Sequence, residues 1–202
     1  MSKETVVQAI QSELKAITAV AADAQSVSST LSVYQKKRVT VMIDHAKDNA
    51  LAAVGAGAEY RVQVSEKDSG NDTWRSLAAV TAQITVPVAV VTDNNEAAGQ
   101  TVIECGAVVP AVGDIIFFKN AVIANSEWAR VVAVDATPGT ENFTIADGLT
   151  NAQAAGTYYT QGEHFVATVE VRAVTRLRVI ANNANGSTNR AVVFRVAAIT
   201  ED

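Results

Sequence analysis

Cysteine is nearly absent from this chain of 202 residues, which contains Cys105 and no second one. A disulfide within the chain is therefore impossible, and a small secreted fold held together by disulfides is excluded. Cys105 ends the alternating run Thr101–Cys105. We interpret it as a small core residue and not as a nucleophile.

Long apolar runs are absent as well. No stretch approaches the roughly 20 apolar residues that a membrane helix needs. The start of the chain, Met1–Glu4, lacks the basic region followed by an apolar stretch that marks a signal peptide. We therefore expect synthesis in the cytoplasm, no signal peptide and no membrane partner.

Residues that usually carry chemistry are scarce. The chain has two histidines, too few for a His-based metal cage, and 5% aromatic residues. The oxygen-rich stretch Asp93–Glu96 lacks the spaced carboxylates and central glycine of a calcium loop. Gly55 and Gly57 open no phosphate-binding loop, and no serine stands in a nucleophile elbow. We therefore predict a non-enzymatic protein with no catalytic residue, cofactor, metal or small-molecule substrate.

Basic charge is in the minority. The chain has 16 lysines and arginines against 21 acidic residues, which gives a formal net charge of -5. Non-specific nucleic-acid binding is driven by neutralisation of phosphates, so a mildly acidic chain binds poorly. We expect no direct contact with nucleic acid.

Short alternating runs of β-branched residues are abundant, and they predict strands with one buried face. Three such runs lie close together between Thr168 and Ile199, and we expect them to form one antiparallel sheet. Runs at 31–45, 59–64 and 74–80, the last two joined as a hairpin, are expected to form the layer that covers it. Hydrophobic residues, 49% of the chain, suffice for the core of such a sandwich.

The segment 84–163 differs in composition from the rest of the chain, because it holds all three prolines and is rich in Val, Ala and Gly. Turn signals fall roughly every eight to twelve residues, which is typical of a small barrel or sandwich. Its expected strands lie at 86–91, 101–105, 114–119, 127–135 and 142–145. We interpret the segment as an inserted β-barrel-like domain that makes the sandwich discontinuous, with its halves at 26–83 and 164–202.

Residues 1–25 are predicted to form a helical arm. Val7, Ile10, Leu14 and Ile17 recur at spacings of three and four, which gives a narrow apolar stripe. Two placements stay open: the stripe docks on the protein's own sandwich, or it packs against another subunit. These four residues are candidate interface residues.

Arginines are unevenly distributed, with five of the nine between Arg172 and Arg195. Alternation places Arg176 and Arg178 on one face of a strand, and Arg195 on the outer face of the strand expected beside it. The cluster is either a solvated sheet face paired with cross-strand carboxylates or an assembly surface, where arginine is favoured for planar recognition of carboxylates. All three are candidate interface residues.

Three segments carry a resemblance to a known class: EYRVQVSEKDSGNDTWRSL in the stretch 59–80, GDIIFFKNAVIANSEWARVVAV at 113–134, and the closing strands 176–199. Short Val-rich strands, interrupted by a small β module and preceded by an arm, resemble structural proteins of tailed-bacteriophage virions with immunoglobulin-like or fibronectin-like modules. The Cys–Trp–Cys signature of true immunoglobulin domains is absent. The resemblance therefore implies a mainly β, immunoglobulin-like sandwich without an antibody-type domain.

The same resemblance implies a binding and assembly role in a virion, after synthesis in the host cytoplasm. The expected partners are copies of this chain and other virion proteins. A capsid decoration or cement protein present in many copies is the leading interpretation. A tail-tube, head–tail connector or fibre-adaptor protein is the alternative within that class, and a carbohydrate-binding surface module is the alternative from another class.

Overall fold

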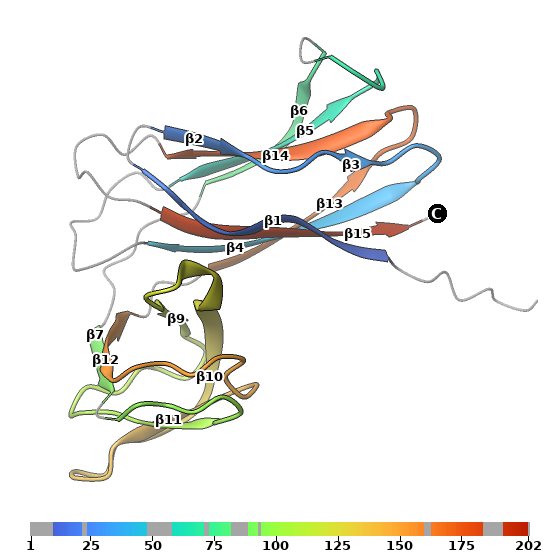
Figure 1. The fold of residues 1–202 in the computed structure, drawn as a ribbon. Coiled ribbons are helices and arrows are strands. Elements are labelled where there is room, and N and C mark those ends of the chain that lie inside the picture. Colours follow the sequence, from blue (N-terminus) through green and yellow to red (C-terminus); the bar gives the residue numbers. More distant parts are fainter. Residues whose placement is uncertain are drawn as a thin grey trace, which may run out of the picture.

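The protein is mainly β, as predicted (Figure 1). The computed structural model describes residues 10–21, 24–47, 58–70, 73–81, 89–92, 94–159, 163–183 and 192–201. These ranges contain fifteen strands and one short 3-10 turn, η1 (Ile123–Asn125), and they contain no α-helix. No helix in the described ranges has the length and hydropathy that crossing a membrane would require.

The strands form three antiparallel sheets. Sheet A has the order β1 (Ile10–Val20), β15 (Val192–Glu201), β4 (Arg38–Lys47), β13 (Glu163–Glu170). Sheet B has the order β2 (Ala24–Val27), β14 (Arg176–Asn183), β5 (Glu59–Ser65), β6 (Arg75–Thr81), and β3 (Leu31–Ser32) also pairs with β14. Sheet C has the order β7 (Ala89–Thr92), β12 (Gly156–Tyr159), β9 (Ile115–Phe118), β10 (Glu127–Asp135), β11 (Asn142–Ile145), β8 (Val102–Glu104).

Sheets A and B pack face to face around one core. Alternate residues of their strands point inward, so Val41 and Phe194 of sheet A meet Tyr60 and Val179 of sheet B, all of them buried. The rings of Tyr60 and Phe194 lie 5.6 Å apart between centroids. Burial of these β-branched and aromatic side chains is the main stabilising contribution that the two sheets share.

The predicted assignment of strands to these two layers is wrong. β13 and β15 belong to sheet A, with β4 between them, whereas β14 belongs to sheet B. The run 31–45 was expected in the covering layer, yet β4 lies at the centre of sheet A. The expected hairpin of β5 and β6 is confirmed. A β-hairpin can be predicted from its turn residues, because its two strands are adjacent in the sequence. When successive strands belong to different sheets, no local sequence pattern shows which sheet each strand joins.

Sheet C is an open sheet and not a closed barrel. Its edge strands β7 and β8 approach each other through one isolated bridge between Thr92 and Cys105. Cys105 is buried in the core of this sheet, as expected. β10 and β11 have the predicted bounds, whereas β12 was not predicted.

The helix predicted over residues 1–25 is wrong for residues 10–20, which form the edge strand β1, whereas residues 1–9 lie outside the described part of the chain. β1 pairs antiparallel with β15, from Ile10 opposite Thr200 to Val20 opposite Val192, with two register shifts between Glu13 and Thr18. An open edge of β15 would leave a row of backbone N–H and C=O groups unpaired, and β1 satisfies them. Residues three apart face opposite sides of a strand, and accordingly Leu14 belongs to the core between sheets A and B whereas Ile17 packs in the separate cluster around Phe117.

We predict that Leu14→Ala lowers the free energy of unfolding by about 2–5 kcal/mol. Leu14 is 3% exposed in the core between sheets A and B, so its loss leaves a cavity there. The measurement is urea unfolding followed by circular dichroism. The exposed neighbour Glu13 provides the control, since Glu13→Ala should change the value by no more than about 0.5 kcal/mol. Equal effects of both changes would contradict the core position of Leu14.

Two loops of sheet C touch at a pair of glycines. Gly99 N donates to Leu149 O at 2.7 Å, and Leu149 N donates to Gln100 O at 3.0 Å. A Cβ on Gly148 would lie 2.6 Å from the backbone oxygen of Gly99, closer than real Cβ atoms come.

We predict that Gly148→Ala destabilises the protein by about 1–3 kcal/mol, because the clash is with backbone that has no flexible end to move away. Gly156→Ala is the matched control, since a Cβ there would meet nothing within 4 Å. Thermal unfolding of both variants tests the contact. A Gly148→Ala protein as stable as the control would show that the loops separate freely.

Candidate functional site

A row of charged side chains crosses the outer face of sheet A. The register sets Arg195 of β15 and His164 of β13 directly opposite Asp44 of β4, one on each side. Asp44 Oδ2 accepts from Arg195 Nε at 2.7 Å, and His164 Nδ1 lies 2.7 Å from Asp44 Oδ1. The Asp44 side chain is only 14% exposed. One carboxylate thus joins three strands.

The pKa of Asp44 is below its ordinary value. Burial alone would raise it, but the hydrogen bonds and charges of His164 and Arg195 act in the opposite direction and outweigh burial. Asp44 therefore stays ionised, and its carboxylate is bound by Arg195 and His164 of the same chain.

Trp128 of β10 attaches sheet C to this row. Its Nε1 donates to the backbone oxygen of His45 at 2.9 Å, and the guanidinium of Arg195 lies 5.9 Å from the centre of the ring. A small buried cluster surrounds the contact, formed by residues of both sheets and the chain near them: Ala46, Phe117 and Val193, with Ile17, Ile123 and Trp128 partly buried against them. We call Asp44, His164, Arg195 and Trp128 the junction.

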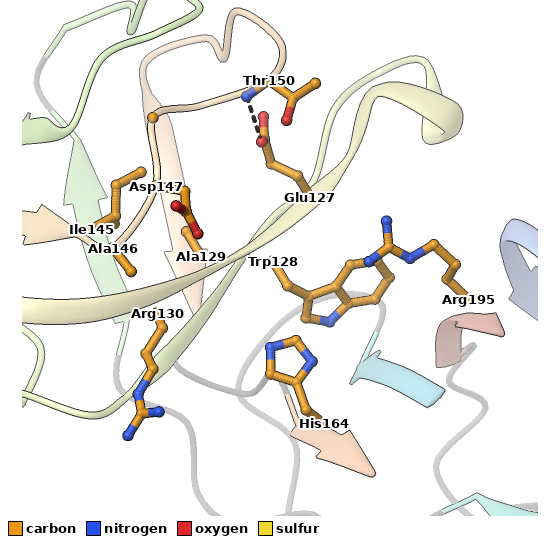
Figure 2. Close-up of a pocket in the computed structure, with 11 residues that line it drawn as sticks. Glu127, Trp128, Ala129, Arg130, Ile145, Ala146, Asp147, Thr150, His164 and Arg195 are labelled. Atoms are coloured by element: carbon orange, nitrogen blue, oxygen red, sulfur yellow. Dashed lines mark hydrogen bonds between the residues drawn. The ribbon is translucent and has the colours of Figure 1, made fainter. Parts of the chain in front are cut away.

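A cavity of about 280 Å³ opens beside the junction, lined by β10, the 145–150 loop, His164 and Arg195 (Figure 2). The Glu127 carboxylate accepts from the backbone N–H groups of Thr150 and Asn151 at 2.8 and 3.1 Å, and from Gln153 Nε2 at 2.8 Å. Both carboxylate oxygens of Glu127 therefore accept hydrogen bonds from residues 150–153 and fix the position of that loop. The arrangement serves as a structural joint whose polar groups are largely occupied.

A second charged surface lies on the outer face of sheet B. Leu177 and Val179 of β14 point into the core, so Arg176 and Arg178 point outward. Both guanidinium groups lie over the ring of Trp74, at 4.9 and 4.1 Å from its centre. We call Trp74, Arg176 and Arg178 the arginine face.

No carboxylate of the described residues pairs with the arginine face. Arg176 donates to the backbone oxygens of Lys67 and Gly70, and Arg178 Nε donates to Gln63 Oε1 at 3.0 Å. Within the described part of the chain, neither arginine forms an ion pair. Burial, followed by the neighbouring charge of Arg176, lowers the pKa of Arg178. Two like charges thus share one indole ring, and no described residue pairs an opposite charge with them.

The arginines predicted to gather on one sheet do not meet, because Arg176 and Arg178 lie on sheet B and Arg195 on sheet A. Of the predicted apolar stripe, Leu14 is buried in the core and Ile17 packs at the junction. Ile10 begins β1, and Val7 lies outside the described residues.

Sequence reasoning missed Asp44, Trp74 and Trp128. Only the pairing of β4 with β13 and β15 brings the junction together, and no residue spacing encodes that register. The alternation of apolar residues in β4 predicts that Asp44 points outward, but it does not predict which residues Asp44 contacts.

The described residues include no group of three or more His, Cys, Asp or Glu side chains that could hold a metal ion. In the oxygen-rich stretch, Asp93 lies outside the described residues and Glu96 is buried. Burial, and then the charge of Glu104, raises the pKa of Glu96. Asn94 Nδ2 donates to Glu104 Oε2 at 2.6 Å.

Known proteins offer few matches to this chain. No protein-family profile matches it, and no curated protein matches it either. Among solved structures, VP17, a capsid protein of bacteriophage P23-77, is similar over 97% of this chain and 100% of that chain, with 11% identity and a TM-score of 0.20. A likeness at that score carries no argument about fold or function.

We predict that Asp44→Asn lowers the free energy of unfolding by about 2 kcal/mol at neutral pH, because it removes charged hydrogen bonds to two strands. A carboxyl whose pKa is lowered by folding stabilises above its ordinary pKa, 3.8 for Asp44, and the contribution disappears as the pH falls through the folded value. The difference between the variant and the parent should therefore shrink between about pH 5 and pH 2.

Urea unfolding at several pH values measures this difference. Glu170→Gln is the control, because the Glu170–Arg38 pair lies on the same sheet but is exposed, with side chains 55% and 54% accessible. It should change stability little at any pH. A pH-independent loss in Asp44→Asn would exclude the proposed role of its charge.

Proposed function

We propose that this protein is a structural component of a bacteriophage virion, which acts by protein–protein contact and performs no catalysis. The observation that carries the binding role is the arginine face, where Arg176 and Arg178 share the ring of Trp74 and form no ion pair with a carboxylate of the described residues. Arginine and tryptophan are the residue types most enriched at the energetic centres of protein interfaces. A carboxylate on a neighbouring protein would complete this cluster.

The virion assignment rests on the class that the strand segments at 59–80, 113–134 and 176–199 resemble. In this proposal, sheets A and B form an immunoglobulin-like sandwich interrupted by sheet C, and the virion is where the chain is located. Stacked sheets with a hydrogen-bonded joint give a rigid unit, which suits a protein that must present a fixed surface in many copies.

Within the virion, we propose the role of a capsid decoration or cement protein. Such a protein binds an assembled shell from outside and adds contacts between its subunits. An interface repeated over a particle multiplies a modest contribution from each copy. The arginine face has the required character, since it presents charge that becomes stabilising when a partner's carboxylate is desolvated beside it.

We predict that antibodies against this chain label the surface of purified phage particles in immunogold electron microscopy. Particles assembled without the chain should form with tails but release DNA at a lower temperature, measured with a fluorescent DNA dye. Added purified protein should restore the release temperature, and the Arg178→Glu protein should restore it less. Absence of the chain from purified particles would refute the virion role, and loss of tails would replace decoration with a tail function.

A further inference from the structure

Charge is distributed unequally between the two parts of the molecule. The segment between β6 and β13, residues 82–162, has eight acidic and two basic residues, a net charge of -6. The rest of the chain has 13 acidic and 14 basic residues, a net charge of +1. The acidic character of this protein therefore belongs to the part that contains sheet C.

Two carboxylates of this part, those of Glu104 and Glu141, lie together at the β8–β11 edge of sheet C. Glu104 ends β8 opposite Asn142 of β11, and Glu141 precedes β11 in the same groove, which Val102 and Cys105 also line. Glu104 is exposed and Glu141 partly exposed. Within the described residues neither forms an ion pair with a basic side chain. We call Glu104 and Glu141 the acidic end.

Both carboxylates have a free oxygen. Glu104 Oε2 accepts from Asn94, and Glu141 Oε2 accepts from the Gly139 N–H at 2.9 Å. These contacts fix the orientation of each side chain and leave Oε1 without a described hydrogen bond. Fixed carboxylates lose less conformational entropy when they pair with an arginine.

The arginine face and the acidic end lie at opposite extremes of the molecule. Figure 1 shows sheet B above sheet A, and sheet C below it, with β6 at the top and β11 at the bottom. The two surfaces therefore cannot meet within one copy. They differ from each other, so a contact between them is heterologous and repeats from copy to copy, which gives a ring or an open filament.

We propose that copies of this chain associate head to tail, with the arginine face of one copy binding the acidic end of the next. Arg178 supplies the free guanidinium N–H groups, and the Oε1 atoms of Glu104 and Glu141 accept them. Guanidinium forms planar, paired hydrogen bonds with carboxylate, and Trp74 holds Arg178 in place by stacking. Of the β5–β6 hairpin carboxylates that the structure describes, Glu66 pairs with Arg75 at 3.8 Å, and no ion pair joins Asp68 to Arg176 or Arg178.

This inference names the partner in the proposed assembly role and rests on that role. A chain that binds a particle in ordered arrays needs contacts to its own neighbours as well as to the shell. A head-to-tail contact provides them with surfaces already present on each copy.

The test is sedimentation velocity of the full chain over a concentration series, at low and at high salt. The wild-type protein should associate with rising concentration, and high salt should weaken the association, since the contact is ionic. Arg178→Glu and Glu141→Arg should each weaken it about tenfold or more. The double variant Arg178→Glu/Glu141→Arg exchanges the charges and should recover most of the association.

Two further variants sharpen the test. Arg75→Glu changes the net charge as Arg178→Glu does, on the same sheet, but its arginine is already paired with Glu66, so association should be unchanged. Glu104→Arg repeats the test at the acidic end, because Glu141 also orders the turn at Gly139. Circular dichroism confirms that each variant folds.

Three outcomes would overturn the inference: a wild-type protein that stays monomeric under all conditions, a double variant as weak as the single ones, or an Arg75→Glu protein as weak as Arg178→Glu. These are distinct from failure of the proposed function. A chain that labels phage particles but stays monomeric loses only the head-to-tail contact, whereas a chain that associates but is absent from particles loses only the virion role.

Discussion

Burial of one face of sheet A against one face of sheet B is the constraint on which the rest of the structure depends. Sheet A cannot form from either half of the chain, because β4 pairs on one side with β13 and on the other with β15. The residues of sheet C lie between these partners in the sequence, so the ends of that segment must come together before the core closes. Such pairings between distant strands make folding slow relative to that of locally paired proteins.

The strict alternation of β4 serves both of its faces. Val41 and Ile43 point into the core, whereas Asp44 and Ala46 point outward to the junction and to sheet C. A slip of one residue in the pairing would bury Asp44 and expose its apolar neighbours, so the core fixes the register of the junction as well. The backbone oxygen of His45 receives Trp128, which ties the position of sheet C to the same strand.

Arg178 and the carboxylates of Glu104 and Glu141 form no ion pair within the described residues. Asp44 pairs with Arg195 and His164, Arg38 pairs with Glu170 of the neighbouring strand, and Arg61 pairs with Glu59 of its own strand. Arg178 differs from these because it is partly desolvated and stacked on Trp74, yet pairs with no carboxylate of the described residues. A folded protein tolerates such a group at a modest cost, and an assembling protein recovers that cost on contact with its partner.

The sequence by itself determined what depends on neighbouring residues: alternation defined β5, β10 and β11, and turn residues defined the β5–β6 hairpin. It also placed Arg176 and Arg178 on one outward face, since a period of two is local. The tertiary structure decided what depends on distant partners. The open edge of β15 made a strand of residues 10–20, although their apolar spacing favours a helix. Two further features depend on which strand edges pair: β14 and β15 lie in different sheets, and Asp44 meets His164 and Arg195. Every residue offers the same backbone hydrogen-bonding groups, so the side chains near a strand do not specify its distant partner.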